Sequence, residues 1–452
     1  MKRILIFAIC LFALISCSCR EEPALKYRPE IVTPSPEKPG EITYSPPVKS
    51  QSNFEAEKPV LCERVTLLAA GDLLCLGGQL STAKAGIAYD FDYCFEKVRD
   101  EISKADIAIA NLETLIADGY PYTAIKPSPA DPPPEIEEQQ PNAADPIKAR
   151  AEGGAAGDLD CPCSLSGTFL LAKPYPKAGA AQPLSSAPRI NGPESFLAAA
   201  VNAGFDVLTT ANNHIYDYQA EGLIKTLEML DRYNVLHTGA FGEPGERVPL
   251  IVKAKGFSVA IFAYTDILNK KPEKDFAYMV NRYDEAAIKA DIEQARAAGA
   301  DFVIVSMHWG IEHTHKPLKS QRNMAKYIAG AGADLIIGAH PHCMQPVELI
   351  ETDRGSVPVF YSLGNFLSSM PDLIHKDGAM IKIVLEKDSG SGSTKIIEMS
   401  YVPTHCFITD EDNFTILPAD SASVSQSPYS SRLQKARERI TKVLGDAVCR
   451  PE

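Results

Sequence analysis

The sequence LIIGAHPHC, residues 335–343, is an apolar run of the kind that forms a buried strand, and it leads into His340 and His342. The whole chain has nine histidines, so two of them placed one residue apart where a strand ends need a chemical reason. In α/β proteins the carboxyl ends of the strands line the crevice where ligands bind. This stretch therefore predicts a ligand-binding edge in an α/β fold.

Four further strand-like runs end in residues that can ligate a metal. They are VTLLAAGD with Asp72, DIAIANLE with Asn111 and Glu113, DVLTTANNH with Asn213 and His214, and FVIVSMHWG with His308. Each motif alone has an ordinary structural explanation as a turn, a cap or a core histidine. Because five strand ends carry such residues in order, we expect them to converge on one site.

Helical patterns alternate with the strand-like runs. They cover residues 91–106, 194–205, 221–233, 284–299 and 320–333, and in 221–233 Leu223, Leu227 and Leu230 share one face. Further strands are expected at 258–264 and 358–366, followed by a hairpin at 380–403. This alternation predicts an α/β core.

A mixed set of oxygen and imidazole ligands suits manganese, iron or zinc, bound as one or two ions, whereas a structural zinc site would use cysteine. Two adjacent cations would clamp a phosphoryl oxygen and activate a bridging water. His214 could then protonate the leaving group. His313 and His315 either serve the same pocket or are simply solvated.

Composition excludes one class of partner and leaves others open. The formal net charge is −13 and the 45 basic residues are scattered, which argues against nucleic-acid binding. A hydrophobic content of 45% is typical of a globular protein. Excluding Cys10 and Cys17, the cysteine count is odd, and Cys75 and Cys343 lie in apolar contexts typical of buried free thiols.

The N-terminus has the pattern of an export signal. Lys2 and Arg3 precede the apolar run ILIFAICLFALIS, which is too short to span a bilayer. Leu14-Ile15-Ser16-Cys17 resembles a bacterial lipobox, so we expect residues 1–16 to be removed and Cys17 to be lipidated; a plain secretory peptide is the alternative. The chain would then lie in the cell envelope, outside the cytoplasm, anchored to a membrane by lipid.

The remaining organisation follows from composition. Residues 17–60 are rich in proline and charge and predict a disordered tether. Residues 61–410 are expected to form the folded domain, with a mostly disordered insertion at about 118–188, in which GTFLLAKPY could pack locally. Residues 411–452 would be a C-terminal tail with an amphipathic helix.

Several of these motifs together resemble the CapA family of bacterial capsule and poly-γ-glutamate synthesis proteins, which is similar to calcineurin-like metallophosphoesterases. The resemblance covers about residues 64–120 and 190–405, and it is carried by blocks such as FDVLTTANNHIYDYQ, SMHWGIEH and ADLIIGAHPHCMQPVE. It implies a four-layer α/β/β/α sandwich with His214 in the leaving-group position. It also implies these metal-ligand positions: Asp72, Glu113, Asn213, His308, His340 and His342.

The chain departs from the phosphoesterase pattern at two motifs. Asp72-Leu73-Leu74 stands where Asp-x-His is usual, so one imidazole is missing, and Asn111-Leu112-Glu113 replaces Gly-Asp-x-x-Asp. Two hypotheses follow. The first is a surface lipoprotein that assists synthesis, export or anchoring of an anionic polymer such as poly-γ-glutamate, together with membrane-bound polymer synthase subunits. The second is a metal-dependent hydrolase in which Asn213 and His214 act at a phosphoester or polymer bond.

Overall fold

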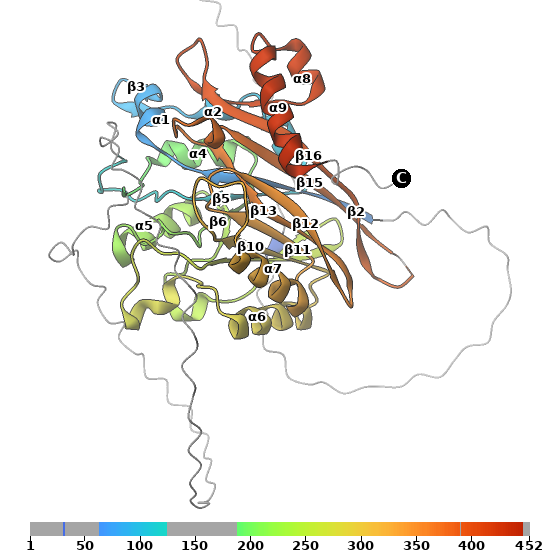
Figure 1. Ribbon diagram of the computed structural model, residues 1–452. Coiled ribbons are helices and arrows are strands. Elements are labelled where there is room, and N and C mark those ends of the chain that lie inside the picture. The colour runs from blue at the N-terminus through green and yellow to red at the C-terminus, as the bar shows by residue number, and fades with distance from the viewer. Residues whose placement is uncertain (1–29, 32–62, 124–187, 389, 446–452) are drawn as a thin grey trace, which may run out of the picture.

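The computed structural model describes residues 30–31, 63–123, 188–388 and 390–445 (Figure 1). The export signal with Cys17, almost all of the expected tether, and residues 124–187 of the expected insertion, including GTFLLAKPY, lie outside this part of the chain. Within the expected tether, β1 (Glu30–Ile31) pairs with the sheet edge. In the described residues, no helix is long and apolar enough to cross a membrane.

Two sheets form the centre of the molecule. The first has the order β1, β8 (Leu250–Ala254), β9 (Phe257–Thr265), β10 (Phe302–His308), β11 (Leu335–Ala339), β13 (Gly355–Leu363) and β12 (Met344–Thr352). The second has the order β17 (Phe414–Pro418), β16 (Thr394–Ile408), β15 (Asp377–Lys387), β2 (Glu63–Leu73), β5 (Ile107–Leu112), β6 (Val207–Thr209) and β7 (Leu236–Thr238). β14 (Asn365–Leu367) pairs alongside β2, and β3 (Lys84–Ala85) and β4 (Ala88–Tyr89) form a small separate hairpin.

Each sheet contains a run of four adjacent parallel strands. In the first sheet β9, β10, β11 and β13 run parallel, and in the second β2, β5, β6 and β7 do so. The expected hairpin at 380–403 is the antiparallel pair β15 and β16. β17 continues the second sheet beyond residue 410, where the sequence predicts only a tail, because residues 414–418 pair with β16.

Helices cover the outer faces of the two sheets. The longer ones are α4 (Glu194–Ala203), α5 (Gln219–Arg232), α6 (Glu285–Ala297) and α7 (Lys319–Ala331). A further long helix, α9 (Ser430–Leu444), instead packs against β12, β15 and β16, where Ile440 and Leu444 join the core between the two sheets. Shorter ones are α1 (Gly77–Thr82), α2 (Asp92–Phe95), α3 (Arg99–Lys104), α8 (Ser421–Gln426) and the 3₁₀ turns η1 (Pro244–Glu246), η2 (Lys274–Met279) and η3 (Leu373–His375). The single helix expected over 91–106 is broken into α2 and α3, because Val98 N–H bonds the carbonyl of Phe95 in a tighter turn.

Side-chain alternation along the strands explains the layers. In β2, Leu67 and Ala69 pack between the sheets, while Leu68 and Ala70 face the cluster that contains α4 and α5. In β10, Ile304 joins the inter-sheet core, whereas its neighbours on the other face pack against α6 and α7. Successive strand residues point to opposite faces of the sheet. A strand that is apolar along both faces therefore packs into two cores, one on each side of its sheet. The predicted four-layer α/β/β/α sandwich is therefore confirmed.

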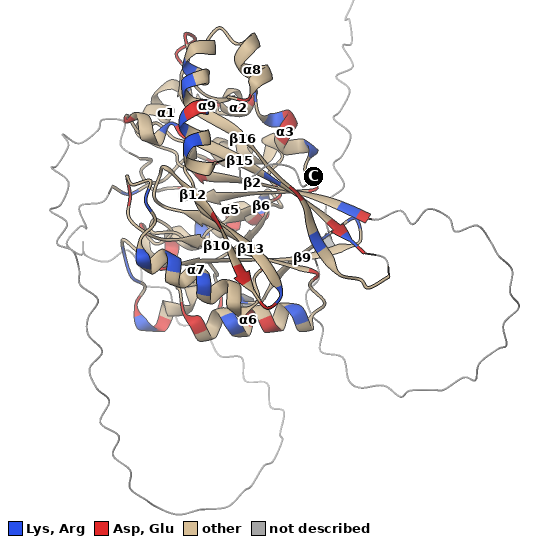
Figure 2. Cartoon of the chain, turned by 45° about the vertical axis from the view of Figure 1, so that its right-hand side comes forward, with Lys and Arg blue, Asp and Glu red and all other residues tan. Residues whose placement is uncertain are grey.

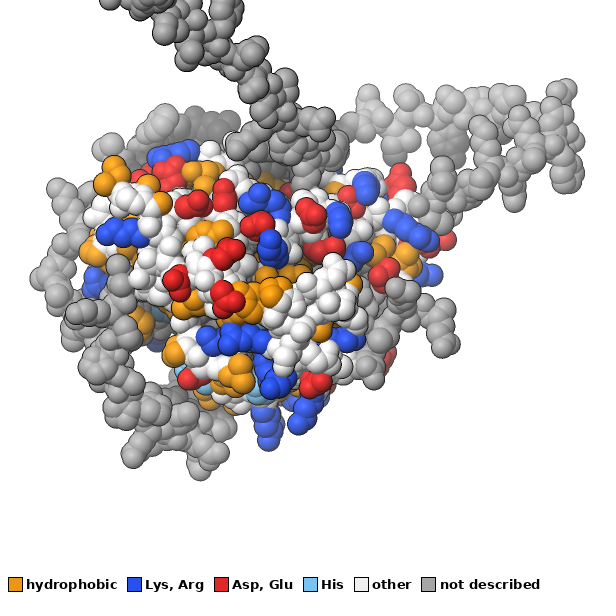
Figure 3. Space-filling model, turned by 90° about the horizontal axis from the view of Figure 1, so that it is seen from above, with side chains coloured by type: hydrophobic (Ala, Val, Ile, Leu, Met, Phe, Trp, Pro, Cys, Tyr) orange, Lys and Arg blue, Asp and Glu red, His pale blue; other side chains and the backbone are white. Residues whose placement is uncertain are grey.

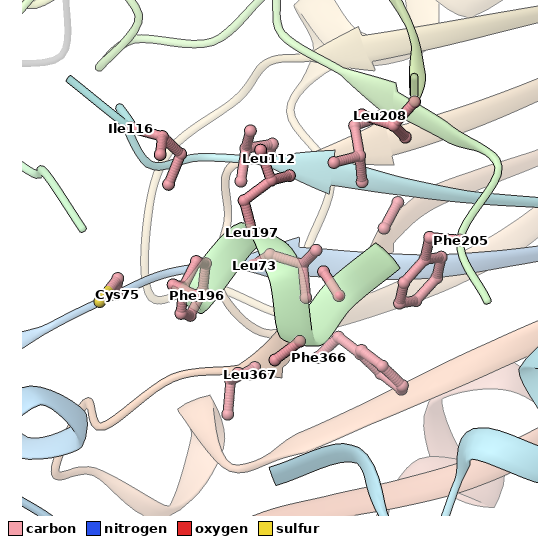
Figure 4. Packing of buried hydrophobic residues seen from close by; sticks show 14 of the residues in the cluster. Leu73, Cys75, Leu112, Ile116, Phe196, Leu197, Phe205, Leu208, Phe366 and Leu367 are labelled. Carbon is pink, nitrogen blue, oxygen red and sulfur yellow. The ribbon is translucent and has the colours of Figure 1, made fainter. Parts of the chain in front are cut away.

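The packing beneath α4 shows how the second sheet is held. Figure 4 shows Phe196 and Leu197 of α4 directed toward Leu73 and Leu112, the last residues of β2 and β5. All four side chains are buried, with at most 1% of their surface exposed. Burying such a side chain contributes about 1.5–3 kcal/mol. The polar residues at the ends of β2 and β5 therefore lie next to strand residues that are packed in the apolar core.

The outer surface of the helices is charged with both signs. Figure 2 shows acidic and basic residues interspersed along α6, and Figure 3 shows side chains of both signs with hydrophobic groups between them on another face. Cys75 and Cys343 are buried free thiols, as expected.

A candidate metal centre at the strand ends

The polar strand ends of the two sheets meet at one edge. In the second sheet, Asp72 lies in register with Asn111 on one side and with Asn365 of β14 on the other. In the first sheet, His308 at the end of β10 lies beside Ala339, directly before His340. All the ligand residues expected from sequence come together here. That they bind a metal stays a prediction.

Glu113 lies at the centre of the group and carries a buried carboxyl without hydrogen bonds. Its side chain is fully buried, and neither carboxyl oxygen has a hydrogen-bond partner. One oxygen lies 3.5 Å from Nε2 of His308 and 3.7 Å from Nε2 of His342. A buried carboxyl without partners costs free energy. A cation placed between these groups would remove that cost.

Asp72 and the amides around it tie the two sheets together. The Asn111 side-chain amide donates a 2.8 Å hydrogen bond to Oδ1 of Asp72, and Oδ2 of Asp72 lies 3.4 Å from Nδ1 of His342. Nε2 of His308 lies 3.1 Å from Oδ1 of Asn213, which follows β6. Oxygen donors from the second sheet therefore face imidazoles from the first.

The loop that holds His340 and His342 has an unusual backbone. His340 has φ 94° and His342 has φ 55°, the left-handed region that non-glycine residues rarely adopt. Such strain persists only where surrounding structure imposes it, and it is common at functional sites. Gly338 is required just before, because a Cβ there would lie 2.0 Å from the carbonyl oxygen of Tyr361. The strand end can thus approach β13 closely and turn sharply.

Three sets of side chains could each hold a cation. They are Glu113 with His308 and His340, Asp72 with Glu113 and His342, and Glu312 with His340 and His342, and within each set the donor atoms lie within 4.8 Å of one another. His340 is also buried, with no hydrogen-bond partner for Nδ1. Orphaned carboxylate and imidazole donors of this kind fit a divalent transition metal.

The electrostatics divide the histidines into two kinds. Burial, with neighbouring imidazoles, lowers the pKa of His308 well below its usual value and that of His340 to about 3, so both are neutral. Burial alone would also lower the pKa of His342, but the charges of Glu113 and Asp72 and a hydrogen bond with Asp72 raise it to about 10. Neutral imidazoles are ready to ligate a metal, and a metal would displace the proton on His342.

His214 lies beside the centre and is oriented by a carboxylate. Its Nδ1 is 2.7 Å from Oδ2 of Asp217, which also accepts a 2.9 Å hydrogen bond from the backbone N–H of Ile190. Asn269, from the segment after β9, lies 3.3 Å from Nδ1 of His214 and 3.5 Å from the side-chain amide of Asn213. A buried carboxylate that holds Nδ1–H leaves Nε2 available for proton transfer.

Sequence reasoning did not identify three residues of this site. Asn365 places Oδ1 3.0 Å from Nδ1 of His342, Asp217 orients His214, and Glu312 belongs to a donor set. Asp217 follows His214 by three residues, a spacing that could have been noticed, whereas Asn365 is brought in only by the pairing of β14 with β2. His313 and His315 are exposed but make contacts, His313 with His375 and His315 with the carbonyl of Met344.

Glu312 connects the centre to this exposed loop. Its Oε2 lies 3.2 Å from Nε2 of His313, whose Nδ1 lies 2.7 Å from Nε2 of the buried His375. Burial would raise the pKa of Glu312, but the hydrogen bond with His313 and the charge of His342 lower it to about 2. Glu312 is therefore an ionised carboxylate at the rim of the buried donors.

The fold and this edge define the chain as a four-layer α/β protein with a candidate metal centre where its two sheets meet. Residues 66–137 and 169–370, more than half of the chain, match the family described as bacterial capsule synthesis protein PGA_cap. The chain belongs to this family, and the resemblance to CapA is confirmed. The matched ranges leave out residues 138–168, which fall inside the expected insertion.

Individual relatives agree with the family match. The capsule biosynthesis protein CapA of Bacillus anthracis is 30% identical over 217 residues, which cover 47% of this chain and 51% of that protein. The PGA biosynthesis protein CapA of Bacillus subtilis is 32% identical over 201 residues, covering 42% and 50%. The chain thus spans about half the length of the curated relatives it matches.

Solved structures give weaker likenesses. A calcineurin-like phosphoesterase from Bacillus subtilis has a TM-score of 0.36 at 12% identity, covering 84% of this chain and 98% of that one. A 5'-nucleotidase precursor from Thermus thermophilus has a TM-score of 0.30 at 11% identity, covering 54% and 44%. The fold assignment here therefore follows from sheet order and core packing rather than from superposition.

Proposed function

We propose that this chain is a lipid-anchored protein of the cell envelope that assists the synthesis, export or anchoring of an anionic capsule polymer such as poly-γ-glutamate. Membership of the PGA_cap family and the names of the Bacillus relatives support this proposal. The lipobox at Cys17 supports the anchor. Membrane-bound polymer synthase subunits would be its partners.

The observation that carries the role of the site is the buried carboxyl of Glu113, which lies between His308 and His342 without a hydrogen-bond partner. We infer that this edge holds one or two divalent ions of manganese, iron or zinc. The proposed ligands are Asp72, Glu113, Asn213, His308, His340 and His342. Such ions attract polymer carboxylates or phosphates and can polarise a bond or an attacking water.

A second function, hydrolysis of a phosphoester or of a polymer amide bond, is favoured by the His214 and Asp217 pair. Asp217 fixes the ring of His214 and favours the tautomer with the proton on Nδ1. Nε2 of the protonated ring would give its proton to the leaving group as the bond breaks. Asn269 and Asn213 would hold the ring and the substrate in place.

Metal content tests the site. The full chain, purified in detergent without chelators and supplied with manganese or zinc, is compared with the His340→Ala/His342→Ala double variant by plasma mass spectrometry. We expect bound transition metal in the wild type and its loss in the variant. A wild type that holds no metal under these conditions would remove the site from the proposal.

Variants tested in cells distinguish the two proposed functions, polymer binding and hydrolysis. If the site only binds polymer, His340→Ala should reduce surface polymer while His214→Ala leaves its amount and attachment nearly unchanged. If hydrolysis is required, both variants should fail, because His214 acts on the leaving group. Unchanged surface polymer after deletion of the whole protein would contradict the capsule role.

A further inference from the structure

The donor sets at the strand ends share residues in a regular way. Glu113 belongs to the first two sets, His340 to the first and third, and His342 to the second and third. A carboxylate can bridge two ions, whereas each imidazole normally ligates one through a single nitrogen. Because Glu113 could serve two ions but His340 and His342 only one each, these overlapping sets could hold at most two ions.

The third set contains Glu312, which lies in the SMHWGIEH block but is not among the metal-ligand positions that the family resemblance implies. We propose that Glu312 is a metal ligand in this chain, closing the rim of the centre beside His340 and His342. The proposal deepens the metal site proposed above and rests on it. Glu312 stands in the loop directly after β10, two residues beyond Gly310, which has φ 90°.

The side chain of Glu312 is more exposed to solvent than those of the other donors. Its side chain keeps 40% of its surface exposed, whereas Asp72 and Glu113 are fully buried and His340 is 5% exposed. The orphaned Nδ1 of His340 provides an independent sign that a ligand is missing at this place. An exposed carboxylate next to buried donors can complete a coordination shell from the solvent side.

The charge balance of the site and its missing imidazole also support Glu312 as a metal ligand. Two divalent ions carry four positive charges, of which Asp72 and Glu113 offset two, and the chain lacks the imidazole usual two residues after Asp72. Glu312 adds a third negative charge and a replacement donor. One oxygen of Glu312 is held by His313, so the other is free to turn toward the metal. His313 is then a positioning residue, as is common for groups that orient a metal ligand.

Glu312→Gln tests this assignment, with Glu228→Gln on the exposed face of α5 as the control that removes the same charge elsewhere. Binding of Mn²⁺ to the full-length chain is measured by isothermal titration, after circular dichroism confirms folding. We expect Glu312→Gln to weaken at least one Mn²⁺ site fivefold or more, and Glu228→Gln to bind like the wild type. A smaller loss in Glu312→Gln would overturn the assignment.

Visible absorption of the Co²⁺-loaded protein separates a ligand from a distant charge. Loss of a ligand should change the ligand-field bands, whereas loss of a nearby charge should weaken binding and leave them unchanged. Unchanged bands in Glu312→Gln would therefore also overturn the assignment. A wild type that binds neither Mn²⁺ nor Co²⁺ would overturn the metal site itself, which distinguishes that failure from the failure of Glu312 alone.

Discussion

Replacing the carboxylate of Glu113 should greatly reduce the stabilisation of the folded state by bound metal. Glu113 is fully buried and belongs to two of the three donor sets, and neither of its carboxyl oxygens has a hydrogen-bond partner, so a bound ion would stabilise its buried carboxylate. A ligand that binds only the folded state stabilises it by about 2.7 kcal/mol at a concentration of 100 Kd. If Glu113→Gln raises Kd by about 100-fold, the same concentration gives only about 0.4 kcal/mol.

The thermal midpoint gives the assay. A chain of this size gains about 2 °C for each kcal/mol, so Mn²⁺ at 100 Kd should raise the midpoint of the wild type by about 5 °C and that of Glu113→Gln by about 1 °C. Glu228→Gln, a surface change of equal charge, should respond like the wild type. Equal midpoint shifts in the wild type and Glu113→Gln would refute the placement of Glu113 at the centre of the metal site.

Three further predictions concern the surroundings of the centre. Asp217→Asn should lower any hydrolytic rate at least about 100-fold with unchanged metal content, because it no longer orients His214; equal rates would contradict this orienting role. Burial raises the pKa of Asp266 to about 6, so its ionised form destabilises the fold above pH 6 and this cost is absent below pH 4. Asp266→Asn should therefore stabilise the protein in urea at pH 8, by at most about 3 kcal/mol, but not at pH 4; an equal effect at both values would refute the sign. Gly338→Ala should lower the free energy of unfolding by more than about 3 kcal/mol, since its Cβ would collide with the Tyr361 carbonyl, and an unchanged urea midpoint would count against that packing.

Local pattern predicted most of the secondary structure. Leu223, Leu227 and Leu230 share a helical face by spacing alone, and all three are buried in α5. The parallel strands are apolar along both faces, so their runs stand out in the sequence. The break between α2 and α3 was not predicted, because the apolar spacing of residues 91–106 continues across it and only the tight turn at Val98 interrupts the helix.

The sequence by itself determined which residue types stand at the strand ends, because a strand ending in Asp72 or His308 carries that chemistry wherever the strand lies. Only the tertiary structure decided which of them meet. Sheet order places Asn365 beside Asp72 although the two are far apart in the chain, and the packing of the two sheets brings Glu113 within reach of His308 and His342. The physical reason is that strand pairing and sheet packing depend on contacts between distant segments, which no local spacing records.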